Sequence, residues 1–152
     1  MTEKKPDLSD IIHKIKKDFY CYRNGIVADV LKKLYPGGKI IYGLTVSQFL
    51  EISRKYPKDL EIGLKLWEDK KTRESRLLAL YLIPPLQLSK ELACEMVKDV
   101  ESTEEAEFLA FRVLRNHPEA HELLEELNQE VLPNSLSVYC REMLFRNLNL
   151  ST

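Results

Sequence analysis

Proline residues and helix-capping residues divide this chain into short amphipathic segments, and this division limits the fold more than any other feature. Apolar side chains recur at helical spacing from Ile12 through Phe19 to Tyr22. Similar segments follow, separated by Pro57, Pro84–Pro85 and Pro133. The only β-like run, Ile40–Tyr42, is too short to found a sheet. The sequence therefore predicts an all-α protein of about nine helices with short connections.

Polar capping residues mark where several of these helices begin. Thr45, Thr72 and Ser89 each precede an apolar run, Ser102–Glu105 reads as a capping box, and Pro118 suits a first helical position. The expected helices cover residues 8–22, 26–35, 45–56, 60–67, 72–83, 89–100, 102–114, 118–131 and 135–148. Trp67 is expected to be a core anchor between neighbouring helices.

Helix pairs recur every 30–40 residues, roughly, which is typical of a HEAT-type stack, where each pair buries its apolar face against its neighbours. We expect residues 1–152 to form a single HEAT-like domain that winds into a small right-handed superhelix. A simple helical bundle stays open as an alternative, because no exact repeat is visible.

The composition, 44% hydrophobic and 31% charged, is that of a globular protein. No apolar run is long enough to span a membrane, and the N-terminal MTEKKPDLSD lacks the apolar core of a signal peptide. We expect a cytoplasmic protein with no membrane partner. Cys21, Cys94 and Cys140 are odd in number and widely spaced, so we expect reduced thiols buried in the core.

The net charge of −1 conceals an uneven distribution along the chain. Residues 1–80 contain 17 lysines and arginines against 11 acidic residues, whereas residues 81–152 contain 6 against 13. The first half could present one basic surface to phosphates. Two solvated faces of different composition would give the same counts.

A basic junction lies between the helix expected over residues 60–67 and the apolar helix expected over residues 72–83. Lys70, Lys71, Arg73 and Arg76 surround the capping residue Thr72. Cations near a helix N-terminus oppose the helix dipole, so an anion held there is one explanation for them. Lys70, Arg73 and Arg76 are three residues apart and share one edge of the helix. This spacing predicts that they bind a phosphate together. A solvated turn, partly neutralised by neighbouring acids, is the alternative.

Several segments resemble the DNA alkylation repair family, the HEAT-like alkylpurine DNA glycosylases. The resemblance covers roughly residues 40–148 and is one of pattern and order. It is carried by Tyr42–Val46 (YGLTV), Leu66–Glu68 (LWE), Glu74–Tyr81 (ESRLLALY), Met96–Ser102 (MVKDVES) and Asn116–Glu119 (NHPE). It implies a HEAT-like fold and duplex DNA as the partner.

The chain departs from this family where catalysis is concerned. Family enzymes flank the damaged nucleotide with a tryptophan and an aspartate one helical turn apart, together with an arginine from a later helix. Here Thr103 takes the tryptophan position, Glu107 the aspartate position, and Arg141 matches the arginine. The carboxylates at residues 101–107 also suit the first turn of a helix, without any catalytic role.

These observations favour a DNA-binding HEAT-like module with a lost or degraded catalytic site. Its phosphate contacts would come from Lys70, Lys71, Arg73, Arg76 and Arg141. A protein-interaction scaffold is the main alternative, favoured by the acidic second half, and a divergent glycosylase using Glu107 is the third. No cofactor is implied. His117 and His121 lie four residues apart but lack a third ligand nearby, so no metal site is expected. The oligomeric state stays open.

Overall fold

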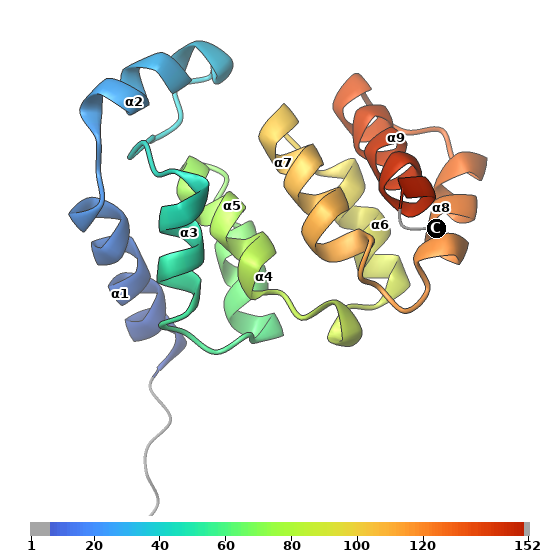
Figure 1. Ribbon diagram of the computed structural model, residues 1–152, viewed down its shortest axis with the longest axis horizontal. Helices are drawn as coiled ribbons and strands as arrows, with labels where there is room; N and C mark the ends of the chain where they lie inside the picture. The colour runs from blue at the N-terminus through green and yellow to red at the C-terminus, as the bar shows by residue number, and fades with distance from the viewer. Residues whose placement is uncertain (1–6, 151–152) are drawn as a thin grey trace, which may run out of the picture. The chain divides into compact units, whose positions relative to one another are not determined.

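The computed structural model describes residues 7–150, and this part of the chain is all-α (Figure 1). Residues 1–6, part of the N-terminal stretch considered above as a signal peptide, lie outside the described residues. The chain divides into two compact units, residues 1–82 and 83–152. The predicted all-α class is confirmed, with nine α-helices in the described part.

Unit 1 contains the first five α-helices and one turn of 3₁₀-helix. They are α1 (Leu8–Cys21), α2 (Gly25–Leu31), η1 (Lys32–Leu34), α3 (Val46–Ser53), α4 (Leu60–Trp67) and α5 (Arg73–Leu82). Helix α5 packs on α3 and α4, and α4 packs on α1. In the described residues the only β-type pairing is the bridge between Ile40 and Thr72. The short run around Ile40 therefore founds no sheet, as the sequence predicts.

Unit 2 contains the remaining helices. They are η2 (Pro85–Gln87), α6 (Lys90–Lys98), α7 (Thr103–Phe108), η3 (Leu109–Leu114), α8 (Ala120–Gln129) and α9 (Ser135–Leu150). Helix α9 packs on α6, α7 and α8, and its Cys140 and Leu144 are buried. The core of unit 2 forms where the apolar faces of these helices meet.

Local capping explains most helix starts. The Asp59 carboxylate accepts from the Ile62 N–H at 3.0 Å, the Ser89 hydroxyl from the Leu92 N–H at 3.1 Å, and the Ser102 hydroxyl from the Glu105 N–H at 3.1 Å. Each bond satisfies one of the donors that a helix leaves unpaired in its first turn. The caps predicted at Ser89 and Ser102 are confirmed.

The helix that begins at Thr103 changes geometry partway along. Residues Leu109–Leu114 form a π-helical turn, and the Arg115 N–H donates to the carbonyl of Ala110 at 2.9 Å. The Asn116 side chain donates to the carbonyl of Arg112 at 3.0 Å and so satisfies an acceptor near the helix end. One extra residue is thus accommodated in this turn without a break in the helix.

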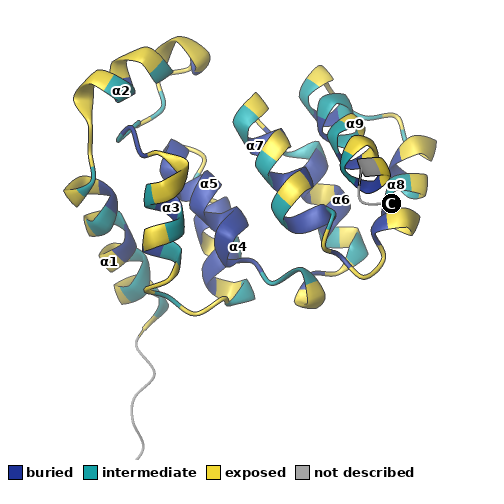
Figure 2. Ribbon diagram, in the orientation of Figure 1, coloured by how far each residue is buried: buried dark blue, intermediate teal, exposed yellow. Residues whose placement is uncertain are grey.

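Helix α5 is the centre of unit 1, because every one of its residues is buried (Figure 2). Leu77, Leu78 and Leu80 bring the apolar surface expected of a core helix. Its first turn also buries Arg73, Glu74 and Arg76. Charged groups in a core need internal partners, and the site description below identifies them.

Two sequence expectations about single residues have different outcomes. Trp67 is buried, which confirms it as a core side chain. Cys94 and Cys140 are free and buried as expected, but Cys21 is exposed, so the expectation of three buried thiols is wrong. Cys21 ends α1 beyond the buried stripe of Ile15 and Phe19, which leaves its side chain at the surface. None of the described helices has the length and apolar character needed to span a membrane.

Candidate nucleic-acid interface

The turn between α4 and α5, residues 68–72, carries two of the predicted phosphate-binding residues at the surface. Lys70 and Lys71 are both exposed. Between them and α4 lies Asp69, which forms an ion pair with Lys16 of α1 at 3.1 Å. This ion pair places a third lysine beside the turn. We call Lys16, Lys70 and Lys71 the lysine cluster.

Asp69 is held ionised within this cluster. Burial raises the pKa of its carboxyl, but the nearby Ser75 hydroxyl and the paired ammonium of Lys16 lower it, and the net pKa lies below the usual value. Asp69 also accepts from the Lys71 N–H at 3.2 Å. A carboxylate that orders both the turn backbone and Lys16 fixes where the cluster stands relative to α1.

A second segment fixes the turn from the other side. The Ile40 N–H donates to the carbonyl of Lys71 at 2.8 Å, and the Arg73 N–H donates to the carbonyl of Ile40 at 3.0 Å. The backbone on both sides of Thr72 is therefore bonded to a segment more than thirty residues earlier. The two exposed lysines project from a backbone that these bonds restrain.

Arg73, the third predicted phosphate ligand, lies inside unit 1. Its Nη1 donates to the Glu74 carboxylate at 2.6 Å and to the carbonyl of Leu44 at 3.2 Å. Its guanidinium carbon also lies 5.8 Å from the centroid of the Phe49 ring. These partners account for the buried charge through an ion pair, a hydrogen bond and a cation–π contact.

Arg76 is buried completely, with 0% of its surface exposed. Its guanidinium carbon lies 3.5 Å from the centroid of the Trp67 ring, and Nη1 donates to the carbonyl of Trp67 at 2.7 Å. Because Trp67 is the last residue of α4, this bond satisfies a carbonyl that the helix leaves unpaired. Arg76 therefore joins α5 to the end of α4.

The carboxylate of Glu74 occupies a group of backbone donors that resembles an anion site. It accepts from the N–H groups of Tyr42 at 2.9 Å, Gly43 at 3.1 Å and Leu44 at 3.4 Å. Successive N–H groups that point at one place form an anion-binding concavity. Here the chain fills it with its own side chain, so Glu74 fastens residues 42–44 to α5.

The remaining predicted site residues lie in unit 2. Glu107 on α7 is exposed and accepts a hydrogen bond of 2.6 Å from the Tyr139 hydroxyl on α9. That hydrogen bond, with burial and the negative charge of Glu107, raises the pKa of Tyr139. Arg141, also on α9, is half-buried, and its Nη1 donates to the carbonyl of Leu127 at 3.5 Å.

The structure thus separates the five predicted phosphate ligands. It brings Lys70 and Lys71 together at the surface, encloses Arg73 and Arg76 in unit 1, and places Arg141 in unit 2. Contact with phosphates stays a prediction for Lys70, Lys71 and Arg141, whereas Arg73 and Arg76 meet their partners inside unit 1. Sequence reasoning missed Lys16 as a neighbour of the turn. The basic run at residues 14–17 is the signal that points to it, but the run alone does not show which lysine faces Asp69.

The division into units follows the charge distribution along the chain. The boundary at residues 82–83 lies within residues 77–89, a stretch without charged residues that separates the basic part of the sequence from the acidic part. In the described part of unit 1, eleven basic side chains are exposed against six acidic ones. In unit 2 the exposed side chains are one basic, Arg146, against eight acidic. The basic excess is therefore a surface property of unit 1.

The described residues contain no group of three histidine, cysteine or acidic side chains placed to hold a metal ion. His117 is engaged inside unit 2: its Nδ1 accepts from the Glu119 N–H at 3.0 Å, and its Nε2 lies 2.7 Å from the carbonyl of Leu88. Since Nδ1 accepts, Nε2 carries the proton and donates. Both ring nitrogens thus serve the packing of the loop before α8.

No family model matches this chain, and neither a curated protein nor a solved structure matches it.

Proposed function

We propose that unit 1 binds duplex DNA through phosphate contacts from the lysine cluster. The observation that carries this proposal is the 3.1 Å ion pair between Lys16 and Asp69, which gathers lysines from α1 and from the α4–α5 turn at the surface of the basic unit. Lysine ammonium groups contact phosphates as point charges and read no sequence. The binding is therefore independent of sequence and weakens steeply as salt rises.

In this proposal the buried arginines position the lysines and do not contact DNA. Arg76 attaches α5 to the end of α4, and Arg73 and Glu74 attach residues 42–44 to α5. The turn that carries Lys70 and Lys71 is thereby held at both of its ends. A restrained turn loses less conformational freedom when its side chains bind phosphates.

We also propose that the helices are HEAT-like pairs and that the chain is a divergent relative of the DNA alkylation repair family. Support for the first comes from α4 and α5, which are joined by a five-residue turn and pack together, with α3 on α5. Support for the second is the sequence resemblance over residues 40–148. The aromatic residue expected beside the damaged nucleotide is replaced by Thr103, so the proposed function is binding without base excision.

The proposal is tested by binding to a labelled duplex that contains an abasic-site analogue, from about 50 to 200 mM salt. We expect affinity that falls with salt, and a slope that decreases by about one for each phosphate-contacting lysine removed. The double variant Lys70→Ala/Lys71→Ala should weaken binding and flatten the slope.

A matched control removes the same charge at the other end of α4. Arg54, which ends α3, and Lys58 are exposed and precede α4, whose eight residues make it about 12 Å long at 1.5 Å per residue. Arg54→Ala/Lys58→Ala should leave the affinity nearly unchanged. Equal losses in both double variants would assign binding to net charge instead of the cluster, and no binding at low salt would reject the function.

Protein interaction is the second candidate, and one observation favours it. Three large aliphatic side chains on α2 and η1 are exposed in unit 1, where nothing on the described surface of that unit covers them. Such a patch marks an interaction surface more often than a contact with phosphates.

A further inference from the structure

An apolar stripe runs along α2 and η1 in unit 1. Ile26, Val30 and Leu34 follow at intervals of four residues and are 81%, 65% and 59% exposed. Figure 2 shows this segment largely in the colour of exposed residues. Residues four apart lie on one side of an α-helix, so Ile26 and Val30 share one side of α2, and Leu34 adds a third exposed aliphatic side chain on η1.

This stripe belongs to an ordered element. The Asn24 side chain accepts from the N–H groups of Ile26 at 3.1 Å and Val27 at 3.2 Å, which caps α2. Ala28 is buried and lies against Gly43, where an added Cβ would come within 2.9 Å of the Ala28 nitrogen. One side of α2 is therefore fixed to unit 1 while the stripe faces solvent. A fixed apolar surface loses little freedom when a partner covers it.

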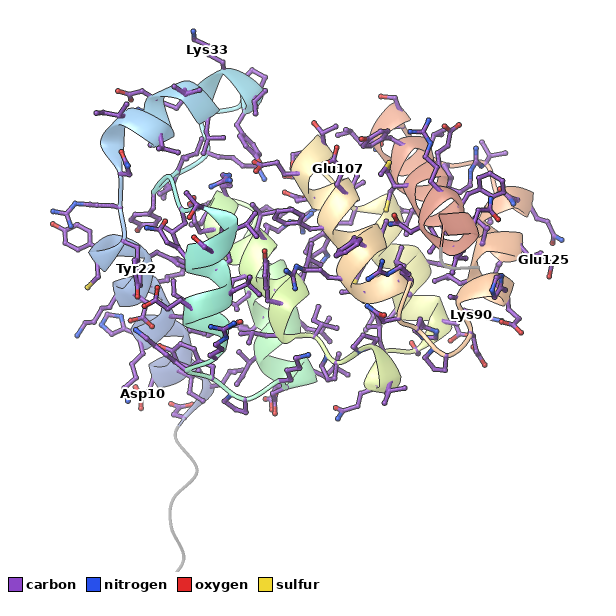
Figure 3. The ribbon with its side chains drawn as sticks, in the orientation of Figure 1. Asp10, Tyr22, Lys33, Lys90, Glu107 and Glu125 are labelled. Carbon is purple, nitrogen blue, oxygen red and sulfur yellow. The ribbon has the colours of Figure 1, made fainter. Side chains whose placement is uncertain are left out.

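Positive charge accompanies the stripe. Lys33 follows Val30 by three residues, is exposed, and extends away from the segment (Figure 3). Lys32 is exposed as well and pairs with Asp29 at 3.3 Å. Unit 1 as a whole has an excess of exposed basic side chains. A partner for this stripe therefore needs an apolar floor and an acidic rim.

Unit 2 of the same chain carries a surface with this chemistry. A hollow of about 360 Å³ lies on α8, and the described residues that line it are His121, Glu122, Leu124, Glu125 and Asn128. Glu122 and Glu125 are exposed, whereas Leu124 is half-buried. Asn128 also lines a second hollow, of about 460 Å³, to which the exposed Phe145 contributes an aromatic ring.

We infer that this protein associates head to tail with a second copy of itself, the apolar stripe of one copy docking on the acidic hollow of α8 in the other. The occupant is a second copy because the exposed charges of the two units are opposite and similar in size, eleven basic against six acidic in unit 1 and one against eight in unit 2. Lys33 meets Glu122 and Glu125 at the rim, and Val30 meets Leu124 at the floor.

The two docking surfaces are different, so the contact is heterologous. A pair of copies keeps one free stripe, on one copy, and one free hollow, on the other. Further copies therefore add until a ring closes or the concentration limits growth. The rim charges are exposed, so salt screens them and shortens the assemblies.

The test is sedimentation of the full chain over a range of concentrations at about 50 and about 500 mM salt. One variant removes the stripe, Ile26→Ser/Val30→Ser, and a second reverses the rim, Glu122→Lys/Glu125→Lys. Two matched controls make the same kinds of substitution at other exposed positions, both in unit 2. Leu86→Ser removes an aliphatic side chain outside the stripe, and Glu91→Lys/Glu95→Lys reverses two charges outside the rim. Circular dichroism checks that each variant keeps the helical content of the parent.

We expect the parent and both controls to form dimers and larger species at low salt, and each docking variant to be monomeric alone. An equimolar mixture of the two docking variants should give a dimer and nothing larger, because each supplies the surface that the other lacks. A parent that is monomeric at every concentration overturns the inference. A stripe that binds an unrelated partner, or that docks within its own chain, would give this result. A monomeric mixture, or a stripe variant that still dimerises, overturns it as well.

The outcome does not depend on DNA binding. Lys70→Ala/Lys71→Ala changes neither docking surface, so it should associate like the parent even where it has lost its affinity for the duplex.

Discussion

The guanidinium of Arg76 stacks 3.5 Å from the centroid of the Trp67 ring and donates to the carbonyl of the same residue. One arginine thereby satisfies the end of α4 and covers its largest side chain. Both residues are buried, and Arg76 belongs to the basic junction between α4 and α5. The chemistry that predicts a phosphate grip at this junction also serves to hold two helices together.

Replacement of Trp67 by alanine should destabilise the protein strongly. The change removes a large core aromatic ring and leaves the Arg76 charge without its cation–π partner, so we expect a loss of roughly 3–5 kcal/mol. Urea unfolding at pH 7, followed by circular dichroism, measures it. Lys71→Ala on the exposed turn is the comparison and should stay within about 0.5 kcal/mol of the parent. A Trp67 variant as stable as the parent would contradict the central place given to this pair.

Gly43 should not tolerate a side chain. Its φ is +88°, in the left-handed region, and an added Cβ would lie 2.4 Å from the carbonyl oxygen of Asn24. The backbone preference alone costs about 1–2 kcal/mol. Since Gly43 also donates to Glu74, a shifted loop weakens that bond too. We expect Gly43→Ala to lose more than about 2 kcal/mol in urea unfolding.

Gly25 provides the matched control for that substitution. It opens α2, no atom lies within 4 Å of an added Cβ, and its φ is not positive. Gly25→Ala should therefore stabilise the protein by about 0.4–1 kcal/mol, because the unfolded chain loses freedom. If both glycine variants changed the free energy of unfolding equally, the result would contradict the close approach of residues 42–44 to α2.

Helix positions were predictable because their signals are local. The Ser89 cap and the break at Pro84–Pro85 depend on neighbours within a few residues, and α6 begins where they indicate. The single-residue bridge at Ile40 likewise agrees with a β run too short for a sheet. The π-turn at Leu109–Leu114 was missed, because its residues keep an ordinary helical apolar pattern.

The environment of the basic junction was not predictable from neighbours alone. Arg73 and Glu74 are buried by residues 42–44, about thirty positions earlier in the chain, and only the folded loop supplies their partners. One local signal did exist. Residues 77–83 are wholly apolar, which is typical of a helix buried on all sides, and such a helix buries its first turn as well.

Asp69 should make stability depend on pH in the acid range. Its pKa is lower in the folded protein than in the unfolded chain, so its contribution is complete above the unfolded value of about 3.9 and is lost as pH falls through the folded value. The ion pair is partly exposed, so we expect less than about 1 kcal/mol. Urea unfolding of Asp69→Asn at pH 7 and pH 2 tests this.

The difference between parent and Asp69→Asn should be present at pH 7 and vanish at pH 2. Glu68→Gln is the control, since Glu68 lies on the same turn but is exposed and pairs with Lys65 only at 3.7 Å. A difference that grew towards low pH would reverse the sign and exclude Asp69 as a stabilising carboxylate.

The three cysteines should differ in reactivity. Burial raises the pKa of Cys94 to about 11 and that of Cys140 to about 12, so neither forms much thiolate at pH 8. Cys21 is exposed. A chromogenic disulfide reagent should therefore label one thiol per chain rapidly, and the other two only after unfolding in urea. Cys21→Ser should lose the rapid phase, and its persistence would place a buried thiol at the surface.

A substitution at Glu107 can test whether the proposed DNA binding occurs without catalysis. Its carboxylate is held by the Tyr139 hydroxyl at 2.6 Å on the exposed side of α7, and the aromatic residue that would flank a damaged nucleotide is absent at Thr103. We therefore expect no release of alkylated bases from a methylated duplex, and the same duplex affinity for Glu107→Gln as for the parent. Chromatography of released bases and the salt-dependent binding assay measure the two. Base release by the parent that Glu107→Gln abolishes would instead establish Glu107 as the catalytic carboxylate, because the substitution removes the charge and keeps the side-chain shape.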